Sequence, residues 1–525
     1  MISRDETQDS ISDIVSGIPA ADSGSDMQPI VRTQTFMVTK IPSRTFPGLV
    51  LVALTILSPG AAHPQNVYSD LPSIGDSSSA AISPEQQKQL GAEMMRQLRQ
   101  SGIVLNDMEI TSYINAIGQH LASNSDAGGQ QFTFFVVNDP AINAFAGPGG
   151  YIGVNSGLIL AAENESELAG VLAHEISHVT QHHLARAFEA QQGLSLPSMA
   201  AMLAAILIGT QNSQAGMAAI SAVSAGSAQY QINFTRDNEK EADRVGIQTL
   251  AQSGYDPNGM PRFFERLQKN SRLYGSHPPE FLLTHPVTTD RIAEAESRAE
   301  SFKGSKTKDS LDFQLIRAKL RVMEYSDPKQ VLEDFQRYMD KSENAPPYKQ
   351  YEYALLLSAA GKTTEAARIL EKLHRGDPDR IAYRLALAND FERGGNYVQA
   401  LKLYKDSLAL YPGDLTFLLP YANTLIVVKQ APEAYKLVSG LRKGQSSNPL
   451  IYKLLAQASE ATGRKVEMHE AMSQYYFLNG YTRDAIQQLE LASHEPGLSN
   501  YDSARIEARQ KELETIFEEE KKASK

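Results

Sequence analysis

A spacing of 34 residues in the C-terminal part of the chain limits its fold more than any other feature. With Pro347 as position 1 of a 34-residue frame, alanine recurs at position 8 and almost always at position 20. These positions hold Ala354, Ala388, Ala422 and Ala456, and then Ala366, Ala400, Ala434 and Met468. Small side chains at fixed places let two helices of one repeat pack closely, and stacked repeats bury a continuous core. The sequence therefore predicts an all-α solenoid over residues 311–525.

The turn between the two helices of each repeat falls at position 15 of the same frame. Glycine occupies this position in three repeats and Lys429 in the other, with Gly361, Gly395 and Gly463 as the glycines. Because glycine closes such turns, we expect an altered turn at Lys429. The pattern is that of tetratricopeptide repeats. Residues 479–492 resemble a further helix pair out of register, and residues 504–522 a charged helix that caps the stack.

Composition narrows the class of protein and the chemistry that is open to it. A chain of 525 residues is too long for one hydrophobic core, and its net charge of -11 disfavours nucleic acid as a partner. The chain has no cysteine. Any metal site must therefore use histidine and carboxylate ligands.

The N-terminal region resembles an export signal that starts inside the printed sequence. Residues 1–36 are polar and acidic, which predicts a disordered extension or a segment upstream of the true start at Met37. Residues 37–62 hold basic residues, a short apolar run and then small residues, in the order of a secretory signal peptide. We therefore predict a signal peptide over 37–62, a linker over 63–83 and a first folded domain over 84–310. A signal peptide predicts export of the mature protein, and the alternative for this segment is an uncleaved anchor or a buried segment.

This first domain has the pattern of a mainly helical fold with a small sheet. Helical periodicity covers residues 85–100 and 106–121, and short β-rich runs cover 131–137 and 149–157. Asn164 is expected to cap the helix that follows it. The apolar stretch 198–229 has three interpretations: a buried helix, a mobile segment over a cleft, or a segment that dips into a membrane.

The capped helix contains "HEISH", in which His174 and His178 are four residues apart and so share one helix face. Two such imidazoles with Glu175 between them form the pattern of zinc hydrolases, two ligands and a general base. His182 and His183 follow at the wrong spacing for ligands, and we interpret them as structural or surface residues. We also expect His182 to continue on the same helix face.

A catalytic zinc needs a third protein ligand and an open position for water. The best candidate lies in "FTRDNEKEADRVG", where Glu239 and Asp243 are four residues apart. Glu239 would bind the metal, Asp243 would hold the free nitrogen of a ligating histidine, and Glu241 would point elsewhere. Glu175 would take a proton from the attacking water. The strand around 151–155 is expected to offer its edge to an extended substrate.

These motifs resemble the HtpX-like zinc metallopeptidases of the gluzincin type. The resemblance rests on residues 143–159, "HEISH", 238–257 and "THPVTTDRI" at 284–292, together with the repeats that follow. It implies one Zn²⁺ per subunit, held by His174, His178 and Glu239. It also assigns His285 either to the open position of the zinc, which would keep the enzyme latent, or to the oxyanion during turnover. The stretch 193–230 falls where such proteins carry a segment that covers the active site.

The fold class predicted is an α+β zincin-like metalloprotease domain, mostly α with a small sheet, followed by the tetratricopeptide solenoid. The resemblance implies a periplasmic zinc metalloendopeptidase that assists outer-membrane β-barrel assembly and degrades misassembled proteins. By resemblance its partners are unfolded or stalled outer-membrane proteins, the β-barrel assembly machinery and the lipopolysaccharide-transport barrel. One alternative is a repeat-mediated chaperone with minor or latent peptidase activity. The other is a membrane-embedded protease anchored through 198–229.

Overall fold

The structure is a computed structural model that describes residues 83–189, 199–200, 228–274, 279–302, 310–342, 344–441 and 447–523. The predicted extension 1–36 and signal peptide 37–62 lie outside the described residues, as do nearly all of the linker 63–83 and most of the apolar stretch 198–229. Among the helices of the described part, none combines the length and the apolar character needed to cross a membrane.

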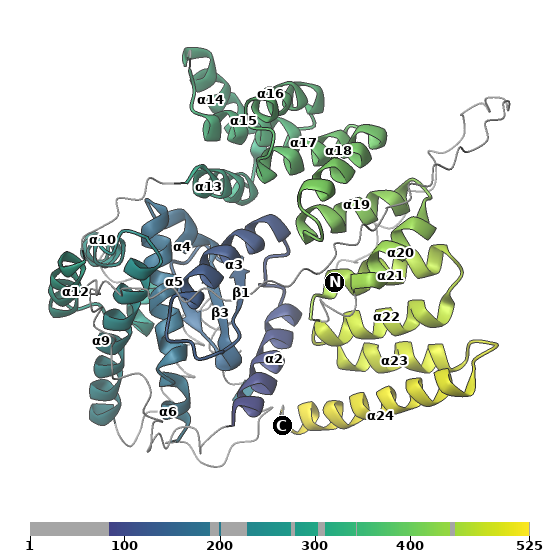
Figure 1. Cartoon of the computed structure of the whole chain (residues 1–525), viewed down its shortest axis with the longest axis horizontal. Helices are drawn as coiled ribbons and strands as arrows, with labels where there is room; N and C mark the ends of the chain where they lie inside the picture. The colour runs from purple at the N-terminus through teal and green to yellow at the C-terminus, as the bar shows by residue number, and fades with distance from the viewer. Residues whose placement is uncertain are drawn as a thin grey trace, which may run out of the picture. The chain divides into compact units, whose positions relative to one another are not determined.

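The first domain consists of helices around a small sheet (Figure 1). Its elements are α2 (Pro84–Gln100), α3 (Met108–Ser123), β1 (Thr133–Val137), β2 (Ala144–Ala146), the 3₁₀ turn η1 (Pro148–Gly150), β3 (Tyr151–Asn155), α4 (Ser156–Ala161), α5 (Glu165–Thr180), α6 (His183–Glu189), α9 (Ala228–Gln252), α10 (Gly259–Tyr274), α11 (Glu280–Thr284) and α12 (Thr289–Ser301).

Helix α5 lies at the centre of this domain. The side chain of Asn164 accepts a hydrogen bond from the backbone N–H of Glu167, so the helix begins where the sequence predicts. Every residue from 166 to 177 is buried, because α3, α9 and α10 pack around the helix. A helix that is buried on all sides holds its polar side chains in fixed surroundings.

The sheet has the order β1-β3-β2, with β3 parallel to β1 and antiparallel to β2. Residues 151–155 therefore form the central strand, and the prediction that they offer an edge is wrong. The backbone groups of β3 form hydrogen bonds with both β1 and β2, which leaves no free edge. The sequence of a single strand does not show how many partners that strand has. In the described part of the chain β2 pairs on one side only, so the edge beside α5 belongs to residues 144–146.

The second half of the described chain is a stack of antiparallel helices (Figure 1). These are α13 (Leu311–Glu324), α14 (Pro328–Lys341), α15 (Pro347–Ala359), α16 (Thr363–Gly376), α17 (Ile381–Arg393), α18 (Tyr397–Leu410), α19 (Leu415–Val427), α20 (Ala431–Leu441), α21 (Pro449–Ala461), α22 (Lys465–Leu478), α23 (Thr482–Ser493) and α24 (Asn500–Ala523). All seven repeat alanines are buried. The predicted fold class is confirmed.

The repeat turn at Lys429 differs from its prediction. Lys429 adopts φ 63°, whereas Gly361, Gly395 and Gly463 have φ between 74° and 82°. The lysine therefore takes the same left-handed conformation as the glycines, and the expected alteration of the turn is wrong. Packing of the helices on either side imposes the backbone geometry on a residue that does not favour it.

Helix α13 contributes to two hydrophobic cores. Phe313, Ile316 and Leu320 belong to the core of the first domain, on the side that faces α4. Leu315 and Ala318 belong to the core of the first repeats, on the side that faces α15. Residues three and four apart share a helix face, so one helix fills both cores with opposite faces.

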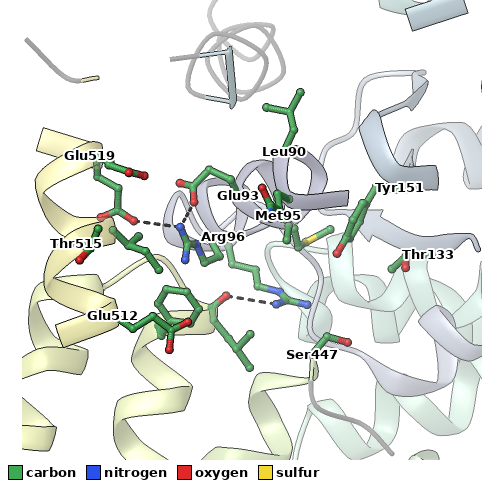
Figure 2. A pocket seen from close by; sticks show the side chains of 17 residues that line it. Leu90, Glu93, Met95, Arg96, Thr133, Tyr151, Ser447, Glu512, Thr515 and Glu519 are labelled. Atoms are coloured by element: carbon green, nitrogen blue, oxygen red, sulfur yellow. Dashed lines mark hydrogen bonds and ion pairs between the residues drawn. The ribbon is translucent and has the colours of Figure 1, made fainter. Parts of the chain in front are cut away.

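A second connection joins α2 to the end of the repeats and borders a cavity of about 650 Å³ (Figure 2). Arg96 of α2 lies 4.1 Å from the ring centre of Phe477 and donates a 3.2 Å hydrogen bond to Glu520 of α24. Arg99 donates a 3.3 Å hydrogen bond to the backbone oxygen of Leu478. The turn at Gly480 approaches α2 so closely that a Cβ there would lie 2.7 Å from the backbone oxygen of Arg96.

Candidate metal centre

Four side chains from three segments bring metal-binding atoms together in the first domain. His174 and His178 come from α5, Glu239 comes from α9, and His285 follows α11 directly. One donor atom from each lies within 4.8 Å of the others. The two α5 histidines face each other through Nε2 atoms that are 3.0 Å apart, as their spacing of four residues predicts. These residues can hold a metal ion.

Close packing of α9 on α5 brings Glu239 to the histidines. Gly246 of α9 lies against the backbone of α5, and a Cβ at this position would be 3.1 Å from the backbone nitrogen of His174. Without a side chain here the two helices approach closely, and Glu239, about two turns earlier on α9, reaches the centre. An oxygen of Glu239 lies 3.5 Å from Nε2 of His174, and the other lies 3.4 Å from Nε2 of His178.

The charges around His174 favour a cation at this centre. Burial alone would lower the pKa of His174, but hydrogen bonds and charge from Asp243 and Glu239 outweigh it and raise the pKa to about 10. Beside Arg291, the two carboxylates therefore favour a further positive charge at the imidazoles, which a bound metal ion or a protonated His174 can supply. Two imidazoles and a carboxylate are also one of the donor sets found in catalytic zinc sites. The residues fit a zinc ion.

Asp243 and Arg291 lie behind the donor cluster. Oδ1 of Asp243 is 3.1 Å from Nδ1 of His174, so the free nitrogen of this histidine faces a carboxylate, as the sequence predicts. Arg291 of α12 donates hydrogen bonds of 2.7 and 2.8 Å to the two oxygens of Asp243. Its Nη1 also lies 2.8 Å from Oε2 of Glu239. One guanidinium thus holds both carboxylates of α9.

Glu175 lies between the donor cluster and β2. Its side chain is buried, and in the described part of the chain neither carboxylate oxygen has a well-aligned hydrogen-bond partner. Burial raises the pKa of Glu175 above its ordinary value, against the charges of His285 and His174, which lower it. A carboxylate in these surroundings takes up a proton more readily than one in water.

A cavity of about 250 Å³ opens beside Glu175. Its lining includes residues 145–149 as well as Glu175, His178 and His285. The edge strand β2 and the loop after it therefore border the same space as the metal-binding atoms.

His285 occupies the middle of the donor cluster. Its Nδ1 lies 3.0 Å from Oε1 of Glu239 and 3.4 Å from Nε2 of His174, and its Nε2 lies 3.5 Å from Oε1 of Glu175. The ring stacks on Phe281 of α11, with 4.8 Å between the ring centres, and the residue is 9% exposed.

In the second pair of histidines, only the helix face predicted for His182 is wrong: His182 is exposed and His183 is buried, and neither belongs to the donor cluster. Helix α5 ends at Thr180, and His182 has φ 55°, so His182 does not continue the helix face. A left-handed conformation costs a residue with a side chain about 1–2 kcal/mol. The turn brings Nδ1 of His183 to 2.9 Å from Nδ1 of His178. Nε2 of His183 lies 3.1 Å from Glu241, which also accepts a 3.0 Å hydrogen bond from Arg186.

Three residues of this region were not assigned a role from the sequence, namely Arg291, His183 and Glu241. Arg291 lies in the "THPVTTDRI" segment that carries the family resemblance. Its place in that segment is the one feature of the sequence that points to a role for Arg291. Glu241 does not point towards Glu239, but it contacts His183, and His183 in turn contacts His178 of the donor cluster. The αL turn at His182 makes this contact, and no spacing rule for a continuous helix predicts it.

Comparisons with known proteins agree with this geometry. Residues 109–299 match peptidase family M48, and residues 393–458 match a tetratricopeptide repeat. The β-barrel assembly-enhancing protease of Escherichia coli K12 is 37% identical over 450 residues, which are 85% of this chain and 92% of the relative. A putative protein of the same name from Vibrio cholerae is 36% identical over 468 residues, 88% of this chain and 96% of the relative.

A more distant relative matches less than half of the chain. The mitochondrial metalloendopeptidase OMA1 of Arabidopsis thaliana is 30% identical over 231 residues, 42% of this chain and 44% of the relative. The matches are named a peptidase family, a protease and a metalloendopeptidase, and together they confirm the predicted enzyme class and metal dependence. The chain is therefore a zinc-dependent metallopeptidase of family M48 and belongs to the family of the β-barrel assembly-enhancing proteases.

Proposed function

We propose that the chain is a periplasmic endopeptidase that acts on outer-membrane β-barrel proteins and degrades those that fail to assemble. The donor cluster of His174, His178, Glu239 and His285 beside the buried Glu175 is the observation that carries the peptidase part. The names of the relatives support the link to β-barrel assembly. The predicted signal at 37–62 supports export.

We assign the roles as follows: His174, His178 and Glu239 bind zinc, Glu175 is the general base and Asp243 orients His174. Bound zinc would supply Lewis-acid chemistry, which acidifies a water molecule and polarises the carbonyl of the scissile bond. Glu175 accepts the proton of the attacking water and passes it to the leaving amine. The raised pKa of Glu175 suits a residue that must first hold a proton and then release it.

The substrate main chain is proposed to extend along β2. This strand lies beside Glu175 and borders the cavity at the centre. Its outer edge can pair with an extended peptide through backbone hydrogen bonds, without regard to the peptide sequence. Such pairing suits a protease that removes unassembled β-strands.

His285 is proposed as a fourth ligand that keeps the enzyme latent. Its Nδ1 faces Glu239 and His174, inside the donor cluster, which favours this role over donation to the oxyanion. A fourth protein ligand displaces the water that hydrolysis requires. We expect His285→Ala to cleave a denatured outer-membrane protein faster than the wild type. A loss of cleavage in this variant, with zinc still bound, would assign His285 to the oxyanion instead.

The Glu175→Gln variant tests the peptidase function. Glutamine preserves the shape of the side chain but cannot take the proton, and removal of a general base costs a factor of about 10²–10⁴ in rate. We expect peptide hydrolysis to fall by at least this factor while one zinc per chain stays bound. Persistent hydrolysis would contradict the proposal. Full rescue of β-barrel assembly by Glu175→Gln would favour the alternative of a chaperone with minor peptidase activity.

The repeats are proposed to bind the protein partners. Stacked helix pairs create extended surfaces that suit unfolded chains or other proteins. The relatives' names support outer-membrane proteins and the β-barrel assembly machinery as partners, and the lipopolysaccharide-transport barrel stays an inference from resemblance.

A further inference from the structure

His183 is a buried, polar side chain that the proposed hydrolysis does not use. The residue is 4% exposed, and its two ring nitrogens both have polar neighbours. Nδ1 lies 2.9 Å from Nδ1 of His178, and Nε2 lies 3.1 Å from Oε2 of Glu241. The rings of His178 and His183 meet edge to face, with 4.8 Å between their centres. His183 therefore connects a candidate zinc ligand to a carboxylate.

The direction of these hydrogen bonds follows from the partners. A carboxylate only accepts, so Nε2 of His183 carries the proton that it donates to Glu241. A neutral ring then has an acceptor at Nδ1, and Nδ1 of His178 must be the donor to it. His178 is thereby held in the tautomer whose Nε2 has a free lone pair. This Nε2 is the atom that lies 3.0 Å from Nε2 of His174 and faces the donor cluster.

The same order of groups stands behind the other α5 histidine. Nδ1 of His174 faces Asp243, which is held by Arg291. Behind His178 the order is His183, then Glu241, then Arg186, whose Nη2 is 3.0 Å from Glu241. Each of the two α5 histidines thus has a carboxylate behind it that is paired with an arginine, and His178 reaches its carboxylate through one additional imidazole.

The backbone supports this connection. His182 adopts φ 55°, and its neighbour Gln181 accepts a 2.7 Å hydrogen bond from Arg186 at its backbone oxygen. An unfavourable backbone conformation is retained where the surrounding structure requires it, and such positions cluster at functional sites. Here the turn ends α5 two residues after His178 and returns His183 onto it.

We propose that His183 and Glu241 are positioning residues that fix the tautomer and orientation of His178 and so strengthen zinc binding. This inference rests on the proposed zinc site. Partners of this kind behind a ligand raise its basicity, and their removal weakens metal binding by a factor of about 10–100. Packing alone would not require a donor and an acceptor on opposite sides of the ring.

The test is zinc affinity of the metal-free full-length chain, measured by competition with a chromophoric chelator. We expect His183→Leu to bind zinc about 10–100-fold more weakly than the wild type. His183→Gln can accept from His178 and donate to Glu241 through its amide, and we expect it to recover most of the affinity. Lys240→Gln, an exposed neighbour on α9, is the matched control and should bind as the wild type does.

A double-mutant cycle separates a relay from two independent effects. If Glu241 acts through His183, the double variant His183→Leu with Glu241→Gln binds zinc no more weakly than His183→Leu alone. We also expect the visible absorption of the Co²⁺-substituted protein to change in His183→Leu and to return in His183→Gln. If the losses of zinc affinity in the two single variants multiply in the double variant, or if His183→Leu binds zinc as the wild type does, the proposed role of His183 and Glu241 is wrong. Neither result would contradict the proposed zinc site itself. A wild-type chain that binds no zinc would overturn the proposed site as well.

Discussion

At the scale of single residues, Arg291 supplies the positive charge that holds Asp243 and Glu239 at the candidate metal centre. Burial would raise the pKa of Asp243, but hydrogen bonds from Arg291 and His174 outweigh it and lower the pKa below its ordinary value. The same guanidinium contacts Glu239. Without this arginine, the two buried carboxylates on α9 would repel each other, and their negative charge would favour the protonated form of His174 over the neutral one.

We expect Arg291→Lys to weaken zinc binding by about tenfold, since a compact ammonium cannot hold two carboxylates in the fork geometry of a guanidinium. Chelator competition would measure the loss. Arg298→Lys is the matched control, because Arg298 also lies on α12 but pairs with Glu294 at the surface, where such pairs contribute little. Equal affinity in the two variants would contradict the role of Arg291.

How far the sequence predicts this centre depends on how local each contact is. His174, His178 and Asp243 are found from helical spacing, because residues four apart share a face whatever the rest of the fold does. Arg291 and His183 are not found, because one comes from a distant helix and the other from a turn. His285 comes to attention only by resemblance, since nothing in its own neighbourhood in the sequence marks it as a donor.

At the scale of elements, the repeat helices impose their geometry on the turns between them. Lys429 has the left-handed φ of the glycines at the same position of the repeat. The sequence predicts the helix pairs well, since small residues at fixed spacing determine their packing. It does not predict this turn, because the cost of one strained residue is small beside the burial of two helices. The order of the strands is likewise set by partners that lie elsewhere in the chain.

We expect Lys429→Gly to raise the free energy of unfolding by about 0.5–1 kcal/mol. Relief of the left-handed conformation is worth about 1–2 kcal/mol, and the greater freedom of glycine in the unfolded chain offsets part of it. The reverse change at the equivalent turn, Gly395→Lys, should destabilise by a similar amount, and no atom hinders a Cβ there. Chemical denaturation checks both. A loss of stability in Lys429→Gly would show that the lysine side chain makes a contact of its own.

At the scale of the whole described chain, contacts at both ends of the repeats hold them to the peptidase domain. Helix α13 joins the first repeats, and Arg96 and Arg99 of α2 join the last ones. Arg96, labelled in Figure 2, is 8% exposed and combines an ion pair to Glu520 with a ring contact to Phe477. Changes in the terminal repeats can therefore affect α2, which packs against η1, and η1 contributes Pro148 and Gly149 to the lining of the cavity beside Glu175.

We expect Arg96→Ala to destabilise the contact between α2 and α24 by about 2 kcal/mol, from the lost cation–π contact and hydrogen bond. Hydrogen exchange should become faster around residues 477–482 and 512–523 and remain unchanged in the first repeats. Arg337→Ala removes an exposed ion pair and is the control. Unchanged exchange in Arg96→Ala would mean that the contact contributes no stability.

The shared helix α13 also decides where this chain can be divided. A protein ended at residue 310 would lose Phe313, Ile316 and Leu320 from the peptidase core, and one begun at 325 would open the first repeats. Producing either half alone therefore requires both to keep residues 311–324. In each isolated half, one apolar face of α13 would be exposed to solvent, and exposed apolar surfaces of this kind promote self-association.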